Sequence, residues 1–223
     1  DVLIIGSAGG ADVLSSLVFD QTHITAVEMN PVTAHLVTER YADYIGRIFQ
    51  HPKVDFHLAE GRNFVAACHD KFDLIQITMV DSWAGASAGA YVFNESNLYT
   101  REAIADYLAR LRPDGVLSIT RYLHKHEAVR LANVMLEHLE AAGIPDAQER
   151  IAIIEEKDRR QRATVLLKNG PFTPAEADTI ADFSQRHRHH LVYAPHVDAS
   201  RFTVSDPALW CRALIRPARH GYA

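Results

Sequence analysis

The sequence predicts an α/β fold in which a doubly wound, mostly parallel sheet of seven strands carries helices on both faces. Short apolar runs alternate with segments of helical spacing along most of the 223 residues, which is the pattern of repeated strand and helix units. The first apolar run, residues 2–5, breaks into a glycine-rich loop at residues 6–10, and the second ends in Glu28. A glycine loop and a carboxylate at these two strand ends are typical of sheets that bind a nucleotide-like ligand.

The strands are predicted from continuous or alternating apolar residues bounded by glycine, proline or charged residues. The expected strands are residues 2–5, 24–28, 54–58, 72–80, 116–120, 150–155 and 163–168, the last two as an antiparallel pair. Residues 191–193 have the composition of one further short strand.

Helices are predicted where apolar residues recur every three or four positions. The expected helices are residues 13–19, 32–41, 63–68, 98–111, 127–142 and 174–187. Pro31 lies in the first turn of the second helix, Gly143 follows the fifth, and Thr173 with Glu176 forms a capping-box pattern at the sixth. Residues 112–115 are expected as a turn before the strand at 116–120.

Composition and length indicate a ligand-binding domain at residues 1–170, with residues 171–223 as a C-terminal extension packed on it. A net charge of -5, with basic residues scattered along the chain, argues against nucleic acid as a partner. Two distant cysteines and no signal peptide indicate a reduced, cytoplasmic setting. Because the chain starts inside a strand, we expect it to be part of a longer protein.

The glycine loop is the first part of the candidate site. Gly6, Gly9 and Gly10 give G-x-x-G-G instead of G-x-G-x-x-G, which favours an adenosyl ligand without pyrophosphate over a nicotinamide dinucleotide. Glu28, 22 positions after Gly6, is expected to accept both ribose hydroxyls. The alternative is that the glycines only form a turn and that the strand ends in glutamate by chance.

Two further strand ends complete the predicted site. Glu60 and Gly61 would border the adenine, and Asp81 with Ser82 would face the reactive end of the ligand. The predicted binding residues are therefore Gly6, Ser7, Gly9, Gly10, Glu28, Glu60, Gly61, Asp81 and Ser82, with Asp81 as the catalytic residue. Asp81 could instead be a loop cap, and Asp12 could simply favour the positive end of the first helix instead of touching ligand. Residues 82–93, small and uncharged, are expected to form a gate over the pocket.

Thirteen histidines raise the alternative of a metal site. His124 and His126 are close together, as are the histidines within residues 187–190, yet Glu127 is the one carboxylate beside them. Because these groups lack a complete ligand set, no metal is expected.

Several motifs taken together resemble the spermidine synthase family, which has the class I S-adenosylmethionine-dependent methyltransferase fold. They are Ile-Ile-Gly-Ser-Ala-Gly-Gly at residues 4–10, Ala-Val-Glu-Met-Asn-Pro at 26–31, Ala-Glu-Gly-Arg at 59–62, Val-Asp-Ser at 80–82, Leu-Tyr-Thr at 98–100 and Leu-Arg-Pro-Asp-Gly-Val-Leu at 111–117. The resemblance covers residues 1–122 in register. It is closest to bacterial spermidine synthase-like proteins whose soluble domain is joined to membrane-spanning helices.

The resemblance implies a transferase that binds S-adenosylmethionine or its decarboxylated form and moves an aminopropyl or methyl group to a small-molecule acceptor such as an amine. It implies that Asp81 helps to deprotonate the attacking amine, and it leaves room for a homodimer and a membrane tether. The family has a second aspartate three positions after the first, where this chain has Ala84. We therefore expect weak transfer to putrescine; the alternatives are a non-catalytic adenosyl sensor of a membrane protein and an NAD-dependent oxidoreductase.

Overall fold

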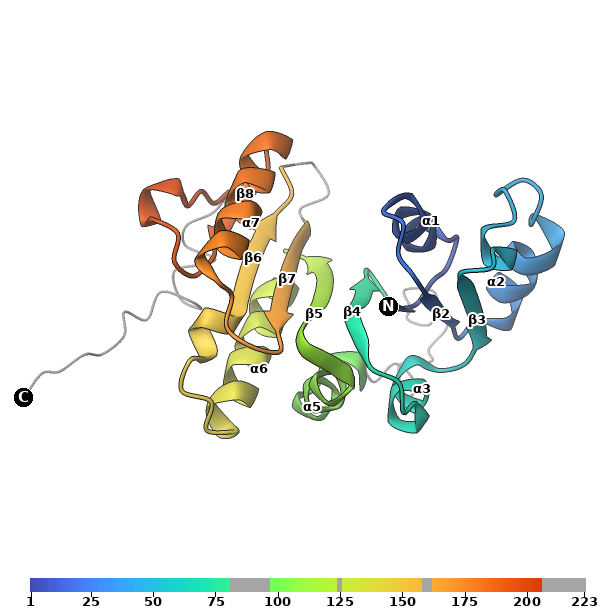
Figure 1. Cartoon of the computed structure of the whole chain (residues 1–223), viewed down its shortest axis with the longest axis horizontal. Helices are drawn as coiled ribbons and strands as arrows, with labels where there is room; N and C mark the ends of the chain where they lie inside the picture. Colours follow the sequence, from blue (N-terminus) through green and yellow to red (C-terminus); the bar gives the residue numbers. More distant parts are fainter. Residues whose placement is uncertain (81–96, 124–125, 158–161, 206–223) are drawn as a thin grey trace, which may run out of the picture. The chain divides into compact units, whose positions relative to one another are not determined.

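The computed structural model describes residues 1–80, 97–123, 126–157 and 162–205 (Figure 1). The chain divides into two compact units, residues 1–118 and 119–223, and the division falls within strand β5 (Leu111–Tyr122). Strands and helices alternate through the first unit, which confirms the α/β class. The described residues contain eight strands: the seven expected ones and a further strand at His190–Tyr193, where residues 191–193 have the composition of a short strand. The predicted boundary at residue 170 stays a prediction.

The first unit is built on four parallel strands in the order β3-β2-β1-β4. They are β1 (Val2–Ile5), β2 (Ile24–Glu28), β3 (Val54–Leu58) and β4 (Phe72–Thr78). All residues of β1 and β2 are buried, which explains their continuous apolar character. Because the chain winds outward from β1 to β3 and then returns to β4, the switch point of the sheet lies between β1 and β4.

Helices cover both faces of this sheet. Ile4 packs with Val13 of α1 (Ala11–Val18) and with Phe49 of the short helix η2 (Ile48–Gln50). Ile5, which points to the other face because side chains alternate along a strand, lies against Gly61 of α3 (Gly61–Ala67). The α5 helix (Arg101–Arg110) contacts α3, and η4 (Asn97–Tyr99) precedes it.

Several expected boundaries differ from the structure, including those of two helices and one turn. The helix expected at 63–68 begins at Gly61, because the Glu60 side chain caps it by accepting from the backbone N–H groups of Arg62 and Asn63. The helix expected at 32–41 is α2 (Pro31–His35), which continues as a π-helical segment, η1 (Leu36–Arg40). Residues 112–115 belong to β5 instead of a preceding turn.

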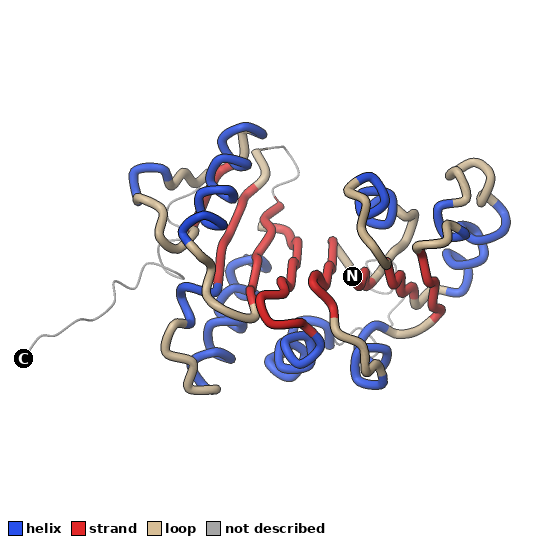
Figure 2. Tube along the Cα trace, in the orientation of Figure 1, coloured by secondary structure: helices blue, strands red, loops and turns tan. Residues whose placement is uncertain are grey.

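The second unit contains an antiparallel arrangement in which β6 (Ile151–Glu155) lies between β7 (Arg162–Lys168) and β8 (His190–Tyr193). Its helical segments are α6 (Glu127–Ala141), η6 (Ala147–Arg150), α7 (Pro174–His187) and η7 (Ala199–Arg201) (Figure 2). The predicted capping box of Thr173 and Glu176 is present at the start of α7. Ala181 of α7 packs with Ala152 and Leu191.

Candidate functional site

The glycine loop joins β1 to α1 in a conformation that needs glycine. Gly6 has φ 76° and Gly10 has φ 87°, values that side-chain-bearing residues rarely adopt. A Cβ atom on Gly6 would overlap the Val80 side chain, and one on Gly10 would overlap Ile48. Gly9 differs, since a Cβ atom there would meet no atom of the described residues within 4 Å. The loop therefore packs closely at its two ends and faces open space at Gly9.

Glu28 is clamped by the loop it faces. Its side chain is 8% exposed, and its two carboxylate oxygens accept from the backbone N–H groups of Ala8 at 3.0 Å and Asn30 at 2.7 Å. Each carboxylate oxygen can accept a second hydrogen bond. The arrangement thus holds a partly buried anion with two acceptor positions to spare, which suits a pair of neighbouring hydroxyl groups.

Glu60 and Gly61 lie at the neighbouring strand end. The Ala59 N–H donates to the carbonyl of Glu28 at 2.9 Å, so the ends of β2 and β3 stay in register up to this point. The Glu60 carboxylate accepts from the N–H groups of Arg62 at 2.9 Å and Asn63 at 2.8 Å. Its first role is therefore to cap α3, which fixes the backbone where an adenine was predicted to lie.

The end of β4 has a strained backbone and a side-chain anchor. Met79 adopts φ 54°, which is unusual for a residue with a long side chain and is typical of functional strand ends. The Tyr99 hydroxyl donates to the carbonyl of Val80 at 2.9 Å. Tyr107, buried behind it, donates its hydroxyl to the carbonyl of Leu98 at 3.1 Å. These bonds hold the chain immediately before Asp81.

Asp12 brings a second carboxylate to the same strand end. It lies in the first turn of α1 and is hydrogen-bonded by the side chains of Thr78 and Gln76 on β4. Burial raises the pKa of the Asp12 carboxyl, and the hydrogen bonds from Thr78 and Gln76 oppose that rise. The positive end of α1 also favours the ionised form. The sequence indicated a helix-terminal role, but contacts to residues more than sixty positions away left no local signal.

The structure brings together Gly6, Ser7, Gly9, Gly10, Glu28, Glu60 and Gly61 around the carboxyl ends of β1, β2 and β3. Ser7 is buried, and its hydroxyl has no hydrogen-bond partner within the described part of the chain. Asp81, Ser82 and Ala84, together with the predicted gate at 82–93, lie outside the described residues. The roles assigned to these residues stay predictions.

The described residues bear on two remaining expectations, the absence of a metal site and the membrane tether. They contain no group of three or more histidine, cysteine, aspartate or glutamate side chains placed to hold a metal ion. No helix among them has both the length and the apolar character needed to cross a bilayer.

The family model and the curated relatives that match this chain all belong to proteins of polyamine synthesis. The model of the spermine/spermidine synthase domain matches residues 1–146. Polyamine aminopropyltransferase 2 of Hyperthermus butylicus is 30% identical over 117 residues, which make up 52% of this chain and 36% of that protein. The polyamine aminopropyltransferase of Korarchaeum cryptofilum is 26% identical over 119 residues, 53% of this chain and 34% of that protein. The chain therefore spans about a third of the length of these curated relatives.

Solved structures share the fold. A spermidine synthase in complex with the transition state analogue AdoDATO has a TM-score of 0.57 at 17% identity, covering 96% of this chain and 67% of that one. Spermidine synthase from Thermotoga maritima has a TM-score of 0.58 at 16% identity with the same coverage. Human methyltransferase-like protein 13 in complex with SAH has a TM-score of 0.56 at 15% identity, covering 89% of this chain and 86% of that one. The fold is thus that of spermidine synthases and Rossmann-like methyltransferases, and the chain belongs to the spermine/spermidine synthase domain family.

Proposed function

We propose that this chain is the adenosyl-binding domain of a transferase that moves an aminopropyl group from decarboxylated S-adenosylmethionine to a small amine. The observation that carries the proposal is the Glu28 carboxylate, buried at the end of β2 and held by one backbone N–H of the glycine loop and by that of Asn30. Family membership and relatives named polyamine aminopropyltransferases support the choice of aminopropyl over methyl transfer.

The residues present fit such a ligand. Among residues 1–80 and 97–123 no side chain fills the space at Gly9, which leaves room for a ligand against the backbone. The Ser7 hydroxyl, which has no partner among the described residues, offers a hydrogen bond to that ligand. In this proposal Glu28 accepts the ribose hydroxyls, the backbone at Glu60 and Gly61 borders the adenine, and Asp81 faces the reacting centre. S-adenosyl ligands supply a sulfonium whose neighbouring carbon can be attacked by an amine.

Aminopropyl transfer forms a carbon–nitrogen bond as the carbon–sulfur bond breaks, leaving methylthioadenosine and one proton from the amine. We assign Asp81 to take that proton, since it follows the strand end held by Tyr99. Ala84 supplies no carboxylate where the family has its second aspartate. We therefore expect slow transfer to putrescine and a different amine as the preferred acceptor.

The proposal also assigns a role to the negative charge of Asp12. Its carboxylate lies at the carboxyl end of β4, bonded to Thr78, next to the glycine loop that would carry the ligand. A partly buried anion there would attract the sulfonium or the amino group of the ligand's side chain. Asp12→Asn should therefore weaken binding of S-adenosylmethionine about tenfold, equivalent to about 1.4 kcal/mol, while binding of uncharged methylthioadenosine barely changes.

The proposal is tested with the full-length protein by calorimetric titration and product analysis. Methylthioadenosine, S-adenosylmethionine and its decarboxylated form are titrated first, with reduced nicotinamide dinucleotide as the competing ligand. Methylthioadenosine release is then measured with decarboxylated S-adenosylmethionine and a panel of amines. Release with an amine other than putrescine is the expected result.

Other outcomes would replace the proposal. Binding of the adenosyl ligands without turnover on any amine would indicate a sensor domain. Methyl transfer from S-adenosylmethionine would indicate a methyltransferase, and selective binding of the nicotinamide would indicate an oxidoreductase. The homodimer, the cytoplasmic setting and the membrane tether are further parts of the proposal, to be tested by the mass and membrane partition of the full-length protein.

A further inference from the structure

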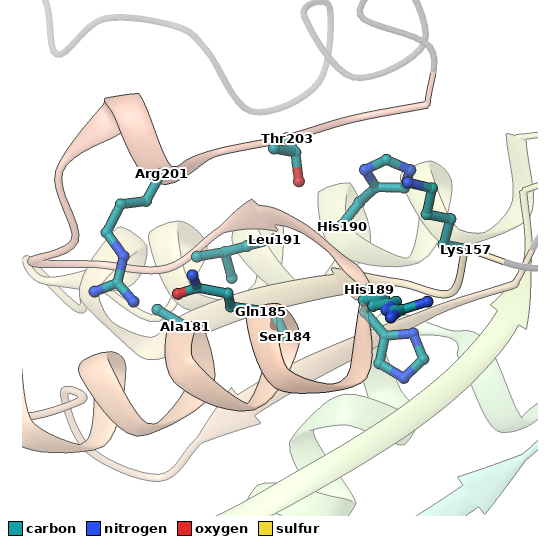
Figure 3. A pocket seen from close by; sticks show the side chains of 10 residues that line it. Lys157, Ala181, Ser184, Gln185, His189, His190, Leu191, Arg201 and Thr203 are labelled. Carbon is teal, nitrogen blue, oxygen red and sulfur yellow. The ribbon is translucent and has the colours of Figure 1, made fainter.

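A second concave site lies wholly within the unit of residues 119–223. It is a pocket of about 460 Å³ bordered by the end of α7, by β8, and by the segments that follow β6 and η7 (Figure 3). Its titratable lining consists of Lys157, Arg188, His189, His190 and Arg201. No carboxylate lines the pocket in the part of the chain that the structure describes.

The end of α7 places these basic residues on one rim. Arg188 follows the helix in the left-handed conformation, with φ 58°, and the chain then turns directly into β8. The His189 N–H donates to the Ser184 carbonyl at 2.8 Å, which closes the helix end. On the other side, the Thr203 N–H donates to the Leu191 carbonyl at 2.8 Å. Backbone bonds therefore fix both sides of the pocket.

The cations of the pocket differ in whether a carboxylate neutralises their charge. The Arg201 guanidinium is bound by the carboxylates of Asp178 at 3.3 Å and Asp182 at 2.7 Å. By contrast, the side chains of Lys157 and Arg188 have no hydrogen-bond or ion-pair partner among the described residues. The pocket thus carries two cations whose charge no described carboxylate offsets by direct contact.

Half-buried His189 adds a buried nitrogen atom that has no partner among the described residues. Its Nδ1 atom is inaccessible to solvent and makes no hydrogen bond within the described residues. Buried polar atoms are nearly always paired, so such an atom beside a pocket points to a missing ligand or water. In Figure 3, His189, His190 and Lys157 lie at one end of the pocket and Arg201 at the other. A ligand could therefore be held from several directions.

Three negative features oppose an anion here: the end of α7, Glu155, and the pair Asp178 and Asp182, whose two charges exceed the single charge of Arg201. The C-terminal end of α7 carries about half a negative charge, and the Arg188 and His189 N–H groups already occupy carbonyls of its last turn. Glu155, which lies opposite His190 in the strand register, is buried and accepts from the Ser205 N–H at 3.4 Å. Lys157 and Arg188 together exceed the charge of Glu155 and of the helix end. The Asp178 and Asp182 side chains are 63% and 62% exposed, so water screens the one negative charge that Arg201 leaves. The histidines add positive charge when protonated.

We propose that this pocket binds a small molecule carrying phosphate groups. Guanidinium, ammonium and imidazole N–H groups are the usual ligands of phosphate oxygens, and the volume exceeds that needed for a single phosphate. The proposal does not depend on the adenosyl site, because every residue it uses lies in the second unit.

The test is calorimetric titration of the full-length protein with inorganic phosphate, pyrophosphate, adenosine triphosphate and adenosine. Two variants remove the uncompensated cations: Lys157→Gln, and Arg188→Gly, which suits the left-handed conformation and so should preserve the fold. Arg188→Lys keeps the charge. Arg186→Gln is the matched control, since Arg186 is exposed on the same helix and does not line the pocket.

Saturable binding of pyrophosphate, weakened about tenfold by Lys157→Gln and by Arg188→Gly, is the expected result, with Arg186→Gln unchanged and Arg188→Lys intermediate. Stronger binding of adenosine triphosphate than of pyrophosphate would identify a nucleotide as the ligand, and equal binding would identify the phosphate groups alone. Absence of saturable binding to all three phosphates, or equal weakening by the Arg186 control, would overturn the proposal.

Discussion

Replacing Glu28 by glutamine is the most direct test of the adenosyl site. The carboxylate accepts two backbone N–H groups, from Ala8 at 3.0 Å and Asn30 at 2.7 Å, and has two acceptor positions left for the ribose. Glutamine has nearly the same shape but keeps one oxygen and carries no charge. One hydroxyl therefore loses its acceptor and the other loses a charged partner.

The size of the effect follows from these bonds. A hydrogen bond to a charged group contributes about 1.5–3 kcal/mol and a neutral one about 1 kcal/mol. Glu28→Gln should thus reduce the binding free energy of methylthioadenosine by about 2 kcal/mol, an increase in Kd of about 30-fold. Glu28→Ala should weaken binding at least as much, because it removes both acceptors.

The variant also disturbs the loop, so stability and binding must be measured separately. The glutamine NH2 group would face one of the two backbone N–H donors, which should lower the free energy of unfolding by about 1–3 kcal/mol. Calorimetry gives Kd and urea denaturation gives stability; Glu39→Gln, which changes an exposed carboxylate of the same unit, is the control. A 2′-deoxy analogue of methylthioadenosine should bind the wild type more weakly and lose less on mutation. Equal Kd values for wild type and Glu28→Gln in a folded protein would refute the assignment.

Other predictions follow from single contacts. Gly6→Ala should lower the free energy of unfolding by about 2 kcal/mol, because its φ of 76° is unfavourable for alanine. Gly9→Ala should leave stability unchanged in denaturation while weakening adenosyl binding, since its Cβ would enter open space. Tyr99→Phe should cost about 1 kcal/mol of stability through the lost bond to Val80, and turnover should fall further. The hydrogen bond from buried Lys168 lowers the pKa of the Glu176 carboxyl, so this ion pair stabilises the fold above pH 4.5 and loses that contribution as the pH falls below it. Glu176→Gln should therefore reduce the loss of stability at acid pH in a profile of unfolding free energy against pH.

The parts of the fold that the sequence predicts are those governed by local signals. The continuous apolar run at β1 and the capping box at Thr173 and Glu176 are both found in the structure. The sequence predicts that α3 starts at Asn63, two residues too late, because asparagine is a common N-cap residue and glutamate is an uncommon one. In the structure the Glu60 side chain takes that role, and its contact with a ligand stays a prediction.

The parts that the sequence did not predict depend on contacts between distant residues. The Tyr99 hydroxyl donates to the Val80 carbonyl across 19 positions, and Thr78 of β4 contacts Asp12 of α1. Neither contact changes the local pattern of apolar and polar residues. The left-handed backbone at Met79 also leaves no mark in composition, because it is imposed by its surroundings.

The Glu28 and Glu60 side chains stabilise the first unit in different ways. Glu60 accepts from N–H groups two and three residues ahead, so it stabilises only the start of its own helix. Glu28 instead accepts from Ala8, 20 residues earlier, and so ties the glycine loop to the second strand. A ligand that shares the Glu28 carboxylate should therefore order the loop as it binds, and by linkage it should raise the free energy of unfolding of the first unit. If Glu28 only held the loop, its substitution would lower stability and leave that ligand-dependent increase intact. Denaturation of Glu28→Gln with and without methylthioadenosine separates these two roles in one experiment.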